Sequence, residues 1–441
     1  MEIRTAAAAE LGRAIGDGKV DPVELTEVFL TAIAAEDADL QIYARTTAER
    51  ARREAAASRE RLKSGNRKSM LDGVPVSWKD LFDTTGIATE AGSKLLAGRI
   101  PDKDAEVVRR AADLGLVCLG KTHMTELAFS GLGINPVTAT PPNRQLPFRC
   151  PGGSSSGAAA SIAFGLAPIA IGSDTGGSVR IPACWNNLVG LKTSYGVLPN
   201  DGVVPLCRGF DTAGPLARTV EDAALMFSIL KGWPLPFEPS ANLSHFDFVV
   251  PTTIVLDDLE DAVATAFEAA LAKLAKNGAR ITRRAEGSFA EFAGLAGKLY
   301  PHEAWAQWGG VIERHGEKMF VPIRKRFATG KQVTLAQYHE AHAQMTSARK
   351  RFQGGLTPST VLLHPTVPIL PPQVDVLLAD EEKFVAANLK ALRNTRMINS
   401  AGGAALTLPL PQAGCGLQLS AGPGSDDMLL EAGAAMERVV G

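Results

Sequence analysis

Two glycine–serine turns, separated by one helix and one strand, constrain this chain of 441 residues more than any other feature. The first reads Pro-Gly-Gly-Ser-Ser-Ser-Gly at 151–157, and the second reads Gly-Ser-Asp-Thr-Gly-Gly-Ser-Val-Arg-Ile-Pro at 172–182. Of the 43 glycines in the chain, many fall between positions 152 and 196. This clustering predicts a site that is built largely from backbone groups.

The second turn places three consecutive backbone amides before a serine. Glycine allows backbone conformations closed to other residues, so the N–H groups of Thr175, Gly176 and Gly177 can point inward together. Such a row of amides forms a concave anion site that suits a developing oxyanion. We therefore expect an oxyanion hole here, with Ser178 placed to attack the carbonyl carbon.

A serine nucleophile needs a base, and Lys79 is the best candidate. It ends the apolar segment Gly-Val-Pro-Val-Ser-Trp-Lys, where desolvation favours the neutral amine. The seven histidines of the chain lie outside both turns. A neutral lysine can deprotonate a serine through an intervening hydroxyl. The residues alone leave open whether that relay is Ser154, Ser155 or Ser156.

Four other readings of the sequence are weaker. The sequence at 153–157 also fits G-x-S-x-G, but the proline-broken segment before it is a poor strand. The glycine loop could cradle a phosphate in a nucleotide-binding protein, yet it lacks the Lys of a phosphate loop. His339 and His342 could share a metal, although the sequence offers no third ligand. For Lys79, the plain alternative is a surface salt bridge with Asp80 or Asp83.

The motifs together resemble the amidase signature family. The resemblance rests on Gly-Val-Pro-Val-Ser-Trp-Lys-Asp at 73–80 and on the two glycine–serine turns, in the same order as in that family. The sequence similarity is strongest from about Leu71 to Asp222, and weaker matches occur at Asn394-Thr-Arg and Asn399. Ser154 lies 24 positions before Ser178 (178 − 154), which is the family's spacing between relay and nucleophile.

The resemblance implies roles for individual residues. Lys79, Ser154 and Ser178 would form a Ser–Ser–Lys triad, with a cis peptide bond at Gly153–Ser154. The oxyanion hole would comprise the amides from Thr175 to Ser178. Supporting roles would fall to Asp174, Arg180 and Ser155.

Strands alternate with helices of ten or more residues, which indicates an α/β sandwich. The resemblance implies three layers, α/β/α, around a large twisted mixed sheet. Two helices are expected within 22–62, one starting at Pro22 and one over about 46–63. Further helices are expected near 105–114, 157–164, 219–230 and 258–275, and another from about Thr125. Strands are expected near 73–80, 116–120, 167–172 and 246–255.

We expect one amidase domain over residues 1–441. Helices would occupy about 1–65, the signature core about 66–230, and a helical cap or insertion about 285–355. From 362 to 440 the pattern indicates strands, turns and a final helix. The chain shows no internal repeat and no low-complexity linker.

The composition of the chain limits which partners and which cellular compartment are expected. A net charge of −1 gives no reason to expect nucleic acid or an anionic membrane as partner. Five widely spaced cysteines fit free, mostly buried thiols in a reducing compartment. With no secretory signal pattern and no apolar run of membrane length, a cytoplasmic protein is expected. Monomer and homodimer are equally compatible, and the mechanism requires no cofactor or metal.

The expected activity is cleavage of an amide-type bond in a small molecule: an amide, an aryl amide, an ester or a carbamate (urethane). Segments 125–145, 285–355 and 362–372 are expected to wall the pocket. The aromatic residues Phe129, Tyr300, Trp305 and Trp308 suggest an apolar or aryl group rather than a small charged acid. The amidase component of a tRNA-dependent amidotransferase is the alternative within the family.

Overall fold

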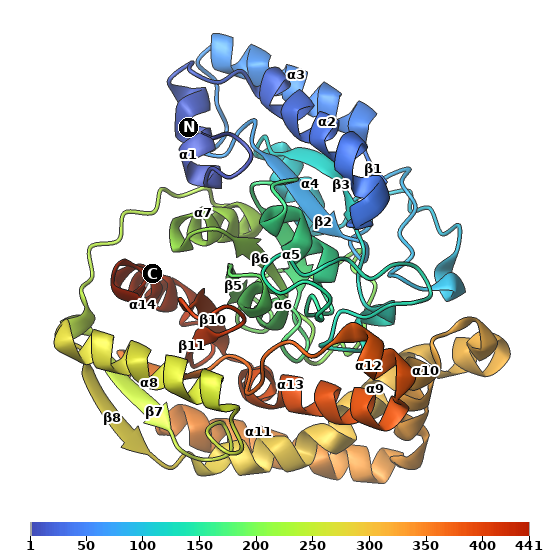
Figure 1. Cartoon of the computed structure of the whole chain (residues 1–441), viewed down its shortest axis with the longest axis vertical. Coiled ribbons are helices and arrows are strands. Elements are labelled where there is room, and N and C mark those ends of the chain that lie inside the picture. Colours follow the sequence, from blue (N-terminus) through green and yellow to red (C-terminus); the bar gives the residue numbers. More distant parts are fainter. Residues whose placement is uncertain (1, 441) are drawn as a thin grey trace.

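Eleven strands form one mixed sheet in the computed structural model, which describes residues 2–440 (Figure 1). The strands are β1 (Tyr43–Thr46), β2 (Pro75–Lys79), β3 (Val117–Thr122), β4 (Ala170–Ser173), β5 (Val189–Lys192), β6 (Ala213–Ala217), β7 (Asp247–Pro251), β8 (Arg280–Arg284), β9 (Thr360–Pro365), β10 (Ala404–Pro409) and β11 (Gly416–Ala421). Their order across the sheet is β1-β3-β2-β4-β6-β5-β10-β11-β9-β7-β8. Because strands from both ends of the chain share this sheet, we propose that the chain is one domain.

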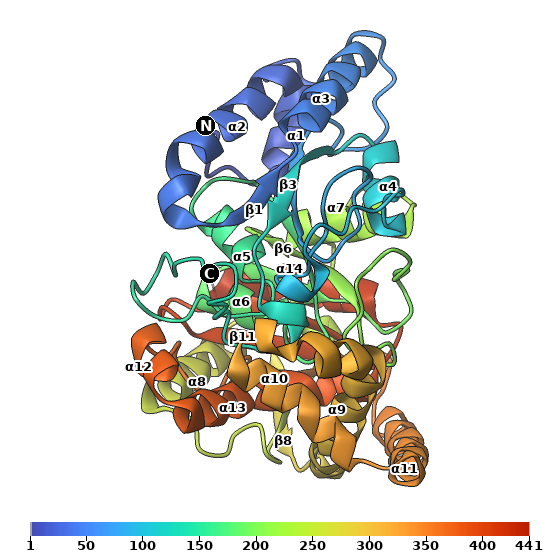
Figure 2. The ribbon, with the colours of Figure 1, turned by 90° about the vertical axis from the view of Figure 1, so that its right-hand side faces the viewer.

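Helices precede, connect and follow these strands. The α-helices are α1 (Ala8–Gly16), α2 (Pro22–Leu40), α3 (Ala48–Lys63), α4 (Glu106–Asp113), α5 (Ser156–Ala163), α6 (Arg180–Trp185), α7 (Val220–Lys231), α8 (Asp261–Lys276), α9 (Gly287–His315), α10 (Val321–Ala328), α11 (Leu335–Gly354), α12 (Val374–Ala379), α13 (Glu381–Ala401) and α14 (Asp426–Val440). Short 3-10 helices lie at Lys94–Leu96, Glu126–Ala128, Leu243–His245, Gly316–Lys318 and Thr329–Gln332. Figure 2 shows α1–α3 at one end of the molecule and α9–α11 at the other.

Helices cover both faces of the sheet, as two adjacent residues of β10 show. Successive side chains of a strand point to opposite faces. Leu406 points toward Gly433 of α14, whereas Thr407 faces the side on which Cys184 of α6 lies. The expected α/β/α arrangement around a mixed sheet is therefore confirmed.

Most elements expected from the sequence are present, and their ends follow capping rules. The side chain of Asp21 accepts hydrogen bonds from the amides of Val23 and Glu24 at the start of α2, with Pro22 in the first turn. The region 285–355 is helical as expected. All five cysteines are free and buried, which confirms that prediction.

Two expectations about the elements are wrong. The helix expected from Thr125 is a single 3-10 turn, because Leu127 and Ala128 adopt positive φ angles of 46° and 60° that an α-helix excludes. The region after 362 also contains the long helix α13, where strands and turns were expected. Its signals were in the sequence: Asp380 caps its start, and Gly402 ends it with a φ of 75°.

The order of strands places the candidate site. β2 lies between β3 and β4 and runs parallel to both, with Trp78 paired to Ile171. The carboxyl ends of β2 and β4 therefore meet at one edge of the sheet. These ends carry Lys79 and Ser173, respectively.

Candidate active site

Lys79 is fully buried at the end of β2 and contacts two serine hydroxyls. Its Nζ lies 2.7 Å from Ser154 Oγ and 2.8 Å from Ser173 Oγ. The neighbouring acids Asp80 and Asp83 pair with other basic side chains. The alternative of a surface salt bridge for Lys79 is therefore wrong.

The surroundings of Lys79 favour its neutral form. Burial lowers the pKa of Lys79 to about 7, although the charges of Asp174 and Asp211 act to raise it. An amine with this pKa is partly neutral near neutral pH, so it can accept a proton.

The first glycine–serine turn brings Ser154 to Lys79 and ties the two turns together. The peptide bond between Gly153 and Ser154 is cis, and the Ser154 carbonyl accepts a hydrogen bond of 3.1 Å from the Thr125 amide. The next residue, Ser155, precedes α5, and its amide donates to the carbonyl of Ser178 at 3.2 Å. The loops that carry Ser154 and Ser178 are thus joined directly by a backbone hydrogen bond.

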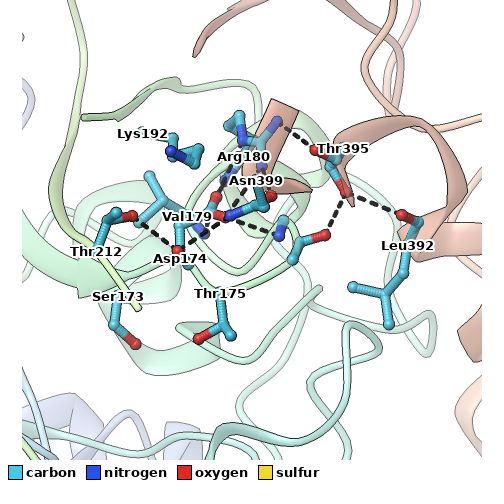
Figure 3. A network of polar contacts seen from close by, with 12 residues as sticks. Ser173, Asp174, Thr175, Val179, Arg180, Lys192, Thr212, Leu392, Thr395 and Asn399 are labelled. Atoms are coloured by element: carbon cyan, nitrogen blue, oxygen red, sulfur yellow. Dashed lines mark hydrogen bonds and ion pairs between the residues drawn. The ribbon is translucent and has the colours of Figure 1, made fainter. Parts of the chain in front are cut away.

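The second turn is organised around the carboxylate of Asp174 (Figure 3). Both oxygens of Asp174 accept hydrogen bonds from Arg180, and Asn399 donates to one of them at 2.8 Å. Burial would raise the pKa of Asp174, but the Arg180 charge and these hydrogen bonds hold it below its usual range. The Arg180 guanidinium also donates to the Thr395 carbonyl and to Gln418. Asp174 and Arg180 therefore brace the loop that carries Ser178.

One amide of the expected oxyanion hole is already occupied. The Gly177 N–H donates to Asp174 at 2.7 Å, which corrects the expectation that its amide is available to an oxyanion. Among residues 2–440, no acceptor is bound to the amides of Thr175, Gly176 or Ser178. Asp174 therefore holds the third of the four amides, and the amides of Thr175, Gly176 and Ser178 stay available.

Ser178 lies at the wall of a small cavity and is 4% exposed. Thr175 and Gly176 line the same cavity. Segments 125–145 and 285–355 contribute to it as expected, through residues such as Phe129 and Tyr300.

Other expectations about the pocket are wrong. The cavity wall contains no residue of 362–372 and neither Trp305 nor Trp308; residues of α13 take that place. Two arginines, Arg326 and Arg396, also line the cavity, so an apolar or aryl group alone does not account for its chemistry.

The sequence reasoning missed three residues that contact the site. Ser173 accepts the second hydrogen bond from Lys79. Asp211 accepts a hydrogen bond of 2.6 Å from the Thr175 hydroxyl, and burial raises the pKa of Asp211 to about 6. The Thr395 hydroxyl donates to the Gly176 carbonyl at 2.7 Å. Ser173 and Thr395 lie within motifs that were noted, but only the fold shows these contacts.

Two further features concern the described part of the chain. Between residues 2 and 440, no cluster of three or more His, Cys, Asp or Glu side chains is arranged to hold a metal ion, so His339 and His342 have no third ligand there. Over the same span, no helix combines the length and the apolar character needed to cross a membrane.

Comparison with known proteins decides the family. The sequence model of the family described as Amidase matches residues 24–430. The chain belongs to the amidase family. The resemblance to amidase signature enzymes is thereby confirmed, and the protein is a hydrolase of this family.

The amidase resembles several relatives over nearly its whole length. It is 35% identical to 2-amino-5-chloromuconic acid deaminase of Comamonas testosteroni, covering 98% of this chain and 97% of that protein. It is 30% identical to a subunit of the glutamyl-tRNA(Gln) amidotransferase of Thermobifida fusca, covering 99% and 96%. A crystal structure described as an amidase superposes with a TM-score of 0.89 at 30% identity, covering 99% of this chain and all of that one.

Proposed function

We propose that this amidase cleaves amide-type bonds of small molecules through an acyl-enzyme on Ser178, with Ser154 as relay and Lys79 as base. The observation that carries the proposal is the 2.7 Å hydrogen bond between the buried Lys79 amine and the Ser154 hydroxyl. A lysine with a pKa of about 7 supplies the neutral base that a serine nucleophile needs.

The first half of the reaction forms the acyl-enzyme. Neutral Lys79 accepts the proton of Ser154 while Ser154 takes the proton of Ser178. The Ser178 oxygen forms a bond to the carbonyl carbon, and the carbonyl π electrons move to oxygen. The amides of Thr175, Gly176 and Ser178 stabilise this negative charge.

The second half releases both products. Collapse of the tetrahedral intermediate breaks the C–N bond, and the proton on Lys79 returns through Ser154 to the leaving nitrogen. Water then attacks the ester, giving its proton to Lys79 by the same route. Ser178 leaves with that proton, and the acid product is released.

Asp174, Arg180 and Ser155 act as positioning residues in this scheme. The Asp174–Arg180 pair fixes the turn, and the Ser155 amide fixes the carbonyl of Ser178. Gly177 contributes to the oxyanion hole through its conformation rather than its amide, which is bound to Asp174. The reaction uses side chains and backbone of this chain with water, so we propose no cofactor.

The proposed substrates are small amides, with aryl amides, esters and carbamates (urethanes) as further members of the same carbonyl class. Bonds other than peptide bonds are proposed, because the cavity beside Ser178 is small. The protein is proposed to act in the cytoplasm, as a monomer or homodimer, without nucleic acid or membrane partners.

Turnover of an amide, an ester and a carbamate by the purified protein tests this function. Wild-type protein is expected to hydrolyse at least one of the three, and Ser178→Ala to lose that activity at least a thousandfold. Ser156→Ala is the matched control, because Ser156 is buried in the neighbouring turn and its hydroxyl has no hydrogen-bond partner among residues 2–440. Retention of activity by Ser178→Ala would refute the proposal.

Two alternative functions are each supported by similarity to one relative. The similarity to part of an amidotransferase supports a role in such an assembly, which predicts glutaminase activity and co-purifying partner proteins. The similarity to 2-amino-5-chloromuconic acid deaminase supports release of ammonia from an amino-substituted acid. Ammonia release from glutamine and from 2-amino-5-chloromuconic acid, measured side by side, separates the two. Family membership favours all of these over the nucleotide-binding alternative.

A further inference from the structure

Two arginines from different helices meet in the wall of the Ser178 cavity. Arg326 belongs to α10 and Arg396 to α13, and these helices lie side by side (Figures 1 and 2). Both side chains line the same cavity as Ser178 and Gly176. Arg396 is close to the turn, because a Cβ on Gly176 would lie 3.8 Å from its Nε.

Aromatic rings and one carbonyl hold these guanidinium groups. Arg326 donates to the Phe129 carbonyl at 2.7 Å, and its guanidinium carbon lies 4.2 Å from the centre of the Phe129 ring. The guanidinium carbon of Arg396 lies 5.7 Å from the centre of the Tyr300 ring. Stacking on a ring orients a guanidinium while leaving most of its N–H groups available to a ligand.

Neither arginine has a carboxylate partner in the part of the chain that the structure describes. The titratable groups that act on Arg326 are Arg396 and Cys207, and those that act on Arg396 are Tyr300 and Cys207, so no carboxylate is among them. Burial lowers the pKa of Arg326 to about 9, and the nearby charge of Arg396 adds to this effect. Two half-buried like charges without a counter-ion are costly, and a bound anion removes that cost.

Two acids of this region, Asp211 and Glu303, already accept hydrogen bonds from other groups. Asp211 accepts hydrogen bonds from the Thr175 hydroxyl and from the amides of Leu206 and Cys207. Glu303 accepts hydrogen bonds from the Gly209 amide and the Tyr338 hydroxyl. Since no carboxylate of the described chain pairs with Arg326 or Arg396, a ligand anion is the natural partner for them.

We propose that Arg326 and Arg396 form a carboxylate subsite, so that the substrate of the hydrolysis proposed above carries a carboxylate near its scissile C–N bond. Arginine matches a carboxylate through two parallel N–H donors. This inference rests on the proposed function and assigns its substrate class.

A matched set of amides tests the subsite. Malonamate, succinamate and glutaramate each carry a carboxylate, and butyramide is a neutral amide of similar size. For at least one of the acids, kcat/KM is expected to exceed that for butyramide by tenfold or more in the wild-type protein. Arg396→Met and Arg326→Met are each expected to lower kcat/KM for that acid by about tenfold to a hundredfold, mainly through KM, and to lower kcat/KM for butyramide by a much smaller factor.

Arg349→Met is the control, because Arg349 is also half-buried and near an aromatic ring but does not line the cavity. A wild-type protein that hydrolyses butyramide as well as all three acids would overturn the subsite and leave the proposed hydrolysis standing. If no amide is hydrolysed, the binding of succinate and glutarate to Ser178→Ala protein, measured by calorimetry, decides whether the carboxylate subsite exists. Binding that is lost in Ser178→Ala/Arg396→Met supports the subsite, and absence of binding refutes it.

Discussion

Asp174 and Arg180 form a fully buried ion pair in which each carboxylate oxygen accepts a guanidinium N–H at 3.0 Å. The pair connects the turn that carries Ser178 to α13 and β11, because Arg180 also donates to the Thr395 carbonyl and to Gln418. The conformation of the candidate site therefore depends on residues more than 200 positions away in the chain, as Figure 3 shows for Thr395.

Removing one charge of this pair should destabilise the protein strongly. Asp174→Asn leaves the Arg180 charge buried without its partner, and we expect a loss of about 3–5 kcal/mol in the free energy of unfolding. Urea unfolding measures the loss. Asp17→Asn is the control, because the Asp17–Lys19 pair is exposed and its removal should have no measurable effect. Equal stability of both variants would show that the buried pair is not the brace described here.

The φ angle of Gly177 gives a second prediction. Its value of 138° is unfavourable for other residues, and an added Cβ would lie 2.2 Å from the Thr395 hydroxyl. Gly177→Ala should therefore be less stable than Gly196→Ala, in which the φ is 81° but the Cβ meets open space. Gly196→Ala should lose about 1–2 kcal/mol, and Gly177→Ala about 1–3 kcal/mol more. A comparison of unfolding midpoints checks the order, and the reverse order would contradict it.

The pKa of Lys79 predicts how the rate depends on pH. The base acts in its neutral form, so the protonated lysine below a pKa of about 7 is inactive. We expect kcat/KM to rise about tenfold per pH unit below that value and to level off above it. Lys192→Met is the control, because burial also lowers the pKa of Lys192 to about 7 but its amine contacts only carbonyl groups. If the pH profile shifted in Lys192→Met, the titrating group would be Lys192 rather than Lys79, which would contradict the prediction.

Two serines of one turn should differ sharply in their effect on the rate. Ser154 contacts Lys79 at 2.7 Å, whereas the buried hydroxyl of Ser156 has no partner in the described chain. Ser154→Ala should lower the rate of acylation about a hundredfold to ten-thousandfold, because the proton relay is lost. Ser156→Ala should retain it within a few-fold. Single-turnover kinetics with an activated ester measure this step, and similar losses in both variants would argue against a relay through Ser154.

The sequence was most informative where chemistry depends on short motifs. The serines, Lys79 and the glycine turn could be predicted because residue type and local spacing carry the signal. The contacts of Ser173 and Thr395 could not, because they follow from strand order and from the packing of α13 on the turn. Likewise, Arg326 and Arg396 are ordinary helix residues in the sequence, and only the fold brings them to one cavity.

Mass spectrometry of the intact protein after incubation with a fluorophosphonate tests the central claim most directly. The account predicts one adduct per chain in the wild-type protein, no adduct in Ser178→Ala, and much slower formation in Lys79→Ala. The adduct should form normally in Arg396→Met, which separates the nucleophile from the proposed carboxylate subsite. An adduct that persists in Ser178→Ala would place the nucleophile elsewhere and contradict the account.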